Sequence, residues 1–208
     1  MLMTPSSYAH RNSGGCSRVV LARIRAGDRD AFEELVRETW DDLVDHLTWI
    51  LSSREAAEDA CQEALVRIWE KREQWHEGSA RGLAFRIARN LAFDTRRRER
   101  VRQDWAAREA EAIQHPEEAD ALAESSEIET RFRQALAALV PGRREVIELV
   151  RLRGLTHQEV AEALGISPQT VANRMTLALA DLRRLLADLL PGLAVSRPSE
   201  SREEGDHG

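Results

Sequence analysis

Apolar residues recur at intervals of three and four along most of this chain, which is the spacing that places them on one face of a helix. Between residues 29 and 51 the spacing is carried by Phe32, Leu35, Val36, Leu43, Leu47 and Ile50. Alternation of apolar and polar residues, the mark of a half-buried strand, does not extend over any length. The sequence therefore predicts an all-α fold that begins with helices at about 17–26, 29–51, 53–74 and 80–102. A capping box of Ser52 and Glu55 is expected to open the third of these helices.

The charge of the chain is divided into a basic block and an acidic block, although the formal net charge is only −6. Arginines dominate residues 81–102, whereas aspartates and glutamates dominate residues 104–129. The acidic stretch contains Pro116 and few large apolar residues, so we expect residues 103–127 to form a flexible linker. Two small helical domains are thus predicted, at residues 18–102 and 128–190. The Ser-, Pro- and Glu-rich tail, residues 191–208, is expected to be disordered.

Several classes of protein are disfavoured by what the sequence lacks. No run approaches the roughly 18 apolar residues that cross a bilayer, and the N-terminus has no apolar core of the signal-peptide type, so a cytoplasmic protein is predicted. Cys16 and Cys61 are far apart, which argues against a disulfide framework or a zinc site. The histidines are scattered, and no Gly-rich phosphate loop or nucleophile elbow is present. We therefore predict no enzymatic activity, metal, cofactor or small-molecule substrate.

The sharpest motif lies in the second domain, where two short helices are joined by a glycine. Thr156 and Glu159 form a capping box that opens the first helix. Gly165 follows this helix, at the point where the chain must adopt a left-handed conformation. Ser167 is placed to cap the second helix, and Pro168 suits its first turn. Together these signals predict a DNA-binding helix-turn-helix.

The second helix of this motif carries the polar residues expected to read base edges: Gln169, Thr170, Asn173 and Arg174. Arg143 and Arg144, which precede the motif, are candidate phosphate contacts. A plain helical hairpin whose polar residues face water would give a similar pattern, so this alternative stays open on the motif alone.

Three segments of the chain carry a family resemblance. They are AEDACQEALVRIW at residues 57–69, FRIARNLAFDTRR at residues 85–97, and the helix-turn-helix region at residues 139–182. In this order they look like the polymerase-binding helix, the −10-element helix and the −35-binding domain of the extracytoplasmic-function (group IV) sigma factors of the sigma-70 family. The resemblance implies a factor that binds RNA polymerase core and directs promoter-specific transcription initiation. The implied partners are the largest and β subunits of the core, promoter DNA and an anti-sigma factor.

The resemblance also implies roles for single residues. Asp59, Gln62 and Glu63 would face the clamp helices of the polymerase largest subunit, with Trp69 packing beneath them. The loop that follows residue 75 and the next helix would capture the non-template −10 strand. The residues implied in this capture are His76, Arg81, Arg86, Arg89, Asn90, Arg96, Arg97 and Arg98.

The chain departs from the family pattern at Leu83, where a Trp is usual, and at Ala172, where a basic residue is usual. The first change is expected to alter packing only, and the second to remove a phosphate contact. The acidic linker fits two interpretations, a mimic of nucleic acid in a basic polymerase channel or a self-repelling spacer. The competing class of protein is a helix-turn-helix repressor or activator that binds operator DNA as a dimer.

Overall fold

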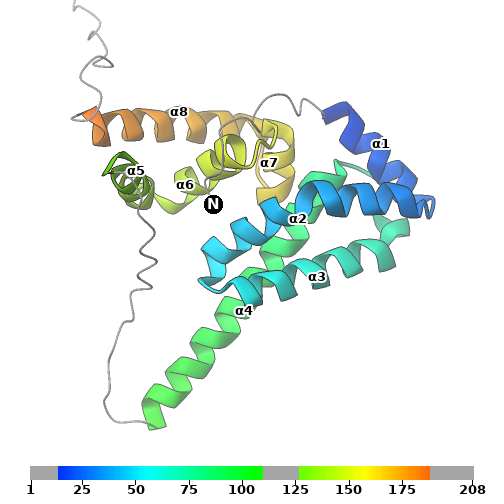
Figure 1. Cartoon of the computed structure of the whole chain (residues 1–208), viewed down its shortest axis with the longest axis horizontal. Coiled ribbons are helices and arrows are strands. Elements are labelled where there is room, and N and C mark those ends of the chain that lie inside the picture. Colours follow the sequence, from blue (N-terminus) through cyan, green and yellow to red (C-terminus); the bar gives the residue numbers. More distant parts are fainter. Residues whose placement is uncertain (1–13, 110–126, 188–208) are drawn as a thin grey trace, which may run out of the picture.

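The computed structural model describes residues 14–109 and 127–187 and contains only helices and turns within them, which confirms the all-α prediction (Figure 1). The helices are α1 (Gly14–Arg25), α2 (Arg29–Leu51), α3 (Arg54–Glu70), α4 (Ala80–Glu109), α5 (Glu127–Ala138), α6 (Pro141–Ile147), α7 (His157–Leu164) and α8 (Pro168–Leu185). A short 3-10 turn at Arg72–Gln74 follows α3, and a π turn at Glu148–Leu152 follows α6. Among the described residues, no helix combines the length and the apolar character needed to span a bilayer.

Helices α1 to α4 cover the expected first domain, and the apolar core that they bury is continuous with that of the helices after them. The predicted helical spacing is confirmed, since Leu43 and Leu47 of α2, Ile68 of α3 and Phe85 of α4 are almost completely buried. The N-terminal half of α4 packs against α2 and α3, and its C-terminal half projects beyond them (Figure 1). This helix was expected to end near residue 102, but it continues to Glu109. The remainder of the expected linker, residues 110–126, and the tail at 191–208 lie outside the described residues.

The junction between α2 and α3 corrects one sequence-based expectation. Ser52 does not open α3; it closes α2, because its N–H donates to the carbonyl of Thr48 and its φ of +56° is left-handed. Such a backbone cannot also take the extended conformation of an N-cap. Ser53 is the cap instead, and its Oγ accepts a hydrogen bond from the N–H of Ala56 at 3.2 Å. The predicted capping box of Ser52 and Glu55 is therefore wrong by one residue.

Helices α5 to α8 cover the expected second domain, and its local signals act as predicted. Thr156 and Glu159 make the reciprocal hydrogen bonds of a capping box at the start of α7. Gly165 ends α7 with a φ of +65°, which a residue with a side chain adopts only at a cost. The Ser167 hydroxyl accepts from the N–H of Thr170 and so caps α8. Helices α7 and α8 therefore form the expected helix-turn-helix.

The two domains pack against each other in this structure. Helix α7 lies across the N-terminal half of α4, and the segment after α6 faces α2 (Figure 1). Two domains were expected from the sequence, but contact between them was not. The reason is physical: the contacting residues are separated by 56 to 108 positions, so no helical period or local motif indicates that they meet.

A buried cysteine makes the stability of the first domain depend on pH. Burial, and to a lesser extent the charge of Glu58, raises the pKa of the Cys61 thiol to about 12. The unfolded chain releases this proton near the ordinary value of about 8.5, while the folded chain keeps it. The contribution of the Cys61 thiol to the free energy of unfolding is therefore fully present below about pH 8.5 and is lost as pH rises towards 12.

We expect urea unfolding to reveal this loss as a difference between the native chain and Cys61→Ala. Between pH 7.5 and pH 10 the native chain should lose about 1–2 kcal/mol more than the variant, since each pH unit above the unfolded pKa contributes about 1.4 kcal/mol. An equal loss in both proteins would show that the thiol ionises as readily in the folded state as in the unfolded state.

Candidate polymerase and promoter interface

The residues expected to bind polymerase lie together on α3. Asp59, Gln62 and Glu63 are all exposed, and their spacing of three and four residues places them on one face of the helix. Glu63 forms an ion pair with Arg67 one turn later, at 2.5 Å. Because this pair is exposed, it holds the carboxylate only weakly, and a partner's cation can replace Arg67. The face therefore presents two exposed carboxylates, those of Asp59 and Glu63.

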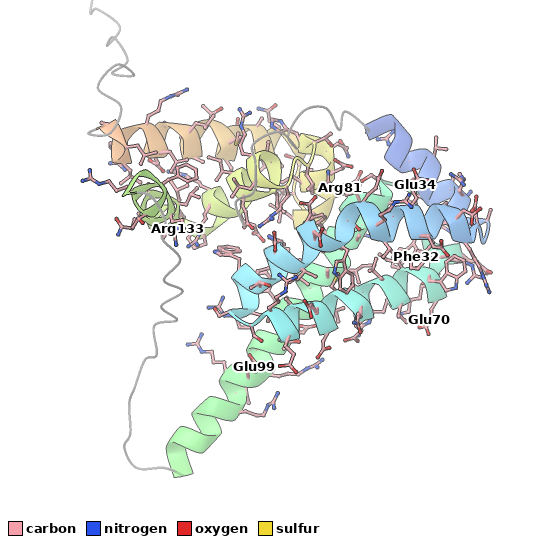
Figure 2. All side chains as sticks on the ribbon, in the orientation of Figure 1. Phe32, Glu34, Glu70, Arg81, Glu99 and Arg133 are labelled. Atoms are coloured by element: carbon pink, nitrogen blue, oxygen red, sulfur yellow. The ribbon has the colours of Figure 1, made fainter. Side chains whose placement is uncertain are left out.

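Trp69 lies at the C-terminal end of the same helix and is half-buried. Its ring packs at 5.1 Å from the ring of Phe32 on α2, and the guanidinium of Arg72 lies 4.9 Å above it. The sequence indicated Trp69 as a candidate, but it indicated Phe32 only as one of the regularly spaced apolar residues of α2. Figure 2 labels Phe32. The Trp69 side chain thus links α3 to α2 directly beside the acidic face.

The expected −10 residues fall into three groups, and the first group is engaged inside the protein. Arg81 forms an ion pair with Asp42 of α2 at 2.6 Å, and its guanidinium is also a donor to the carbonyl of Arg153 in the second domain. Arg89 donates twice to Glu145 of α6, at 2.5 and 3.1 Å. Figure 2 labels Arg81 where α4 meets α2 and the second domain. Neither guanidinium is therefore available to a phosphate in this arrangement.

The second group lines a cavity of about 620 Å³ between the loop before α4, α1 and α7. His76 and Arg86 are exposed in it, and Nη1 of Arg25 lies 3.3 Å from Nδ1 of His76. Trp75 also lines the cavity, but its indole N–H donates to the carbonyl of Ile68 at 3.2 Å. This hydrogen bond favours a packing role for Trp75. The cavity wall combines the basic side chains with the carboxylates of Glu77 and Glu162.

The third group lies on the exposed side of α4. Asn90 borders a shallow hollow together with Phe93, whose side chain is 39% exposed and carries the Arg89 guanidinium at 4.6 Å from its ring. An exposed aromatic ring beside an amide suits an unstacked base. Phe93 was missed as a candidate, although an aromatic residue within a basic helix is a usable signal. Beyond it, Arg96, Arg97 and Arg98 are exposed on the projecting half of α4.

The expected recognition helix of the helix-turn-helix is α8. Gln169 and Asn173 are exposed and joined by a hydrogen bond of 3.1 Å, whereas Thr170 and Arg174 are half-buried. The Thr170 hydroxyl lies 2.8 Å from that of Ser167, so it takes part in the cap. Among these four residues, Gln169 and Asn173 are thus the most exposed, and their amide groups suit contact with base edges.

The two expected phosphate contacts before the motif are both occupied. Arg143 forms an ion pair with Asp181 of α8 at 2.6 Å. The Arg144 guanidinium lies 4.6 Å above the ring of Trp49 on α2, and burial lowers the pKa of this arginine. Arg143 can exchange its carboxylate for a phosphate at little cost, but Arg144 must first leave the other domain.

The fold and these surfaces define a helix-turn-helix protein that also carries an exposed acidic face on α3. Two family models match the chain: "Sigma-70 region 2" over residues 35–102 and "Sigma-70, region 4" over residues 129–182. The ECF RNA polymerase sigma factor SigL of Mycobacterium tuberculosis is 33% identical over 138 residues, which cover 64% of this chain and 76% of SigL. This chain belongs to the ECF RNA polymerase sigma factors.

Further similarities agree with this membership. SigE of Mycolicibacterium smegmatis, also an ECF RNA polymerase sigma factor, is 30% identical over 170 residues, which cover 77% of this chain and 65% of SigE. The structure of CnrH in complex with the cytosolic domain of CnrY has a TM-score of 0.56 at 25% identity and covers 83% of this chain and 97% of CnrH. The sigma factor RpoE of Bartonella quintana, solved with the anti-sigma factor NepR, has a TM-score of 0.51 at 25% identity and covers 74% of this chain and 96% of RpoE.

Proposed function

We propose that this chain binds bacterial RNA polymerase core in the cytoplasm and directs it to promoters with defined −10 and −35 elements, without catalysing a reaction itself. The observation that carries the proposal is that one chain presents an exposed acidic face on α3, exposed arginines on α4 and exposed amide side chains on α8. An acidic face suits the largest subunit of the core, and separated DNA-facing helices suit two promoter elements.

The −10 strand is proposed to run along α4. Asn90 and Phe93 offer an amide and an exposed ring to an unstacked base, and the three arginines that follow offer cations to the strand's phosphates. His76 and Arg86 extend the same cationic surface towards the start of the helix. The arrangement combines a base-binding hollow with a cationic track, which single-strand capture requires.

The −35 element is proposed to meet the N-terminal turns of α8. Gln169 and Asn173 project from the part of a recognition helix that enters the major groove. Their amides suit adenine, which presents one acceptor and one donor there. Because a half-buried Ala172 stands between them and supplies no cation, we propose that Arg174 and Arg143 anchor this domain to phosphates.

An anti-sigma factor is proposed as a further partner. RpoE of Bartonella quintana was solved with such a factor, and it is similar in fold to this chain. The acidic face of α3 is the surface that such a partner would have to cover in order to prevent polymerase binding.

The test of the proposed function is reversal of charge on the acidic face of α3. We expect Asp59→Arg combined with Glu63→Arg to abolish co-elution with core polymerase in size-exclusion chromatography, since like charges then meet across the contact. Transcription from a promoter selected with the native chain from a promoter library should fall by at least about tenfold. Glu33→Arg with Glu73→Arg is the matched control, because both glutamates are exposed elsewhere on the first domain.

Two outcomes would contradict the proposal. One is a native chain that fails to associate with core polymerase while remaining folded. The other is a native chain that binds palindromic duplex DNA stably as a dimer without polymerase, as the alternative class of repressor or activator would.

A further inference from the structure

The exposed side of α8 carries an apolar side chain that the packing of the protein does not use. Leu177 is 47% exposed, whereas Val171, Met175 and Leu182 of the same helix are buried. Leu177 was not among the residues expected to contact DNA. Because removal of apolar surface from water is favourable, a partner that covers Leu177 gains binding free energy.

Leu177 lies on the same side of α8 as the residues proposed to read the −35 element. It follows Asn173 by four positions and Thr170 by seven, and a helix places residues at these intervals one above another. A rise of about 1.5 Å per residue puts the Cα of Leu177 roughly 6 Å beyond that of Asn173 along the helix axis. A helix that lies along the major groove and sets Gln169 and Asn173 against base edges therefore brings Leu177 to base edges about two base pairs further on.

The polar groups beside Leu177 are engaged within the protein. The Thr176 hydroxyl donates to a backbone carbonyl one turn earlier, at 3.1 Å. The Asp181 carboxylate, one turn after Leu177, forms an ion pair with Arg143 at 2.6 Å and lies 3.4 Å from the guanidinium of Arg184. Because two cations compensate the charge of Asp181, its repulsion of a phosphate backbone is weakened. The surface around Leu177 is therefore compatible with DNA.

The chemistry of the major groove limits what a leucine can recognise there. The C5-methyl group of thymine is the apolar group on its base edges, and the groups of the other bases are hydrogen-bond donors and acceptors. A leucine that covers a donor or an acceptor leaves it without a partner, which costs free energy. The amides of Gln169 and Asn173 suit adenine, the base that pairs with thymine. The apolar and the amide side chains of α8 thus favour the same kind of base pair.

We propose that Leu177 packs against the methyl group of one thymine in the −35 element and so determines the preference for thymine at that position. The inference rests on the proposed function and adds a specificity-determining residue to it. Cytosine at the same position would turn its N4 amino group towards the leucine and leave that donor without an acceptor. Together with the amides of Gln169 and Asn173, Leu177 makes α8 a reader of A·T base pairs.

The experiment replaces thymine by uracil, which lacks the C5-methyl group, at one position at a time in both strands of the −35 element. The promoter fragment is one selected with the native chain from a promoter library, and its dissociation constant is measured for polymerase complexes of the native chain and of Leu177→Ala. We expect the native complex to bind about three- to fivefold more weakly when one particular thymine becomes uracil, since the burial of about one methyl group is lost. The Leu177→Ala complex should bind the thymine and uracil fragments equally at that position.

Two further variants separate this contact from a general effect of the leucine. Leu177→Met should keep the preference for thymine, because the methionine side chain is also apolar and adapts its shape. Leu185→Ala is the matched control, since Leu185 is 43% exposed on the same helix but lies eight positions later and about 80° around the helix axis from Leu177. It should keep the native ratio of the two dissociation constants. Both leucines are exposed, so their replacement leaves the core intact.

Failure of this inference can be told from failure of the proposed function. If the native and Leu177→Ala complexes respond equally to every uracil, Leu177 does not contact a thymine methyl group, as would be found if it bound a surface of polymerase instead. If the native complex distinguishes −35 base pairs but no thymine from uracil, the inference is overturned and the proposed function stands. A native complex that is indifferent to every −35 base pair contradicts the proposed function, and the inference with it.

Discussion

Replacing Arg96, Arg97 and Arg98 together by alanine is expected to reduce the salt dependence with which the polymerase complex binds a promoter. These arginines are exposed on the projecting half of α4, where the −10 strand is proposed to pass. Each single-strand phosphate that is neutralised contributes about 0.7 to the slope of log affinity against log salt concentration, so the triple change should lower the slope by about 2. The measurement is retention of a pre-melted promoter fragment by the complex over a series of salt concentrations.

The matched control for this prediction is Arg29→Ala, Arg37→Ala and Arg183→Ala in one chain. These arginines are exposed on α2 and α8, so the change in net charge is equal and the proposed strand path is untouched. The control should keep the native slope. An unchanged slope in the α4 triple variant would place the −10 strand elsewhere.

Replacing Phe85 by alanine is expected to lower the thermal stability of the fold strongly. Phe85 is 1% exposed, and its ring lies 5.7 Å from the ring of His46 where α4 meets α2. Truncation of a buried phenylalanine to alanine costs about 3–5 kcal/mol, against a total stability of about 5–15 kcal/mol for a natural domain. Thermal unfolding followed by circular dichroism measures the loss, and association with core polymerase should decline with it.

Phe85→Leu is the graded comparison, because it keeps most of the apolar volume. It should cost less than about 1.5 kcal/mol and preserve polymerase binding at low temperature. If the alanine variant melted at the native temperature, Phe85 would not be part of the cooperative core, and the packing of α4 on α2 would have to be revised.

Much of the fold could be predicted from the sequence, because the information is local. The helical spacing, the capping box at Thr156, the left-handed Gly165 and the Ser167 cap each depend on residues within about one turn. The one local error, at Ser52, shows the limit of such signals. Two adjacent serines offered the same cap chemistry, and packing of α2 against α3 decided which of them took the extended backbone.

The sequence predicted which residue types form the candidate sites, but not which of these side chains are exposed to a binding partner and which are held inside the protein. Asp59, Gln62 and Glu63 are exposed, as helical spacing implies. Arg81 and Arg89 belong to the same basic helix as the exposed Arg96, yet they are held by carboxylates 39 and 56 positions away. No pattern in the sequence separates an arginine that faces solvent from one that faces another domain.

By itself, the sequence determined the helices, the helix-turn-helix and the basic character of α4, since these follow from hydrogen bonds and apolar contacts between near neighbours along the chain. Only the tertiary structure decided that α7 lies on α4 and that Glu145 of α6 pairs with Arg89 there. That decision depends on shape and charge complementarity between surfaces that meet only after both domains have folded, as between Asp45 and Arg153, which are 108 positions apart.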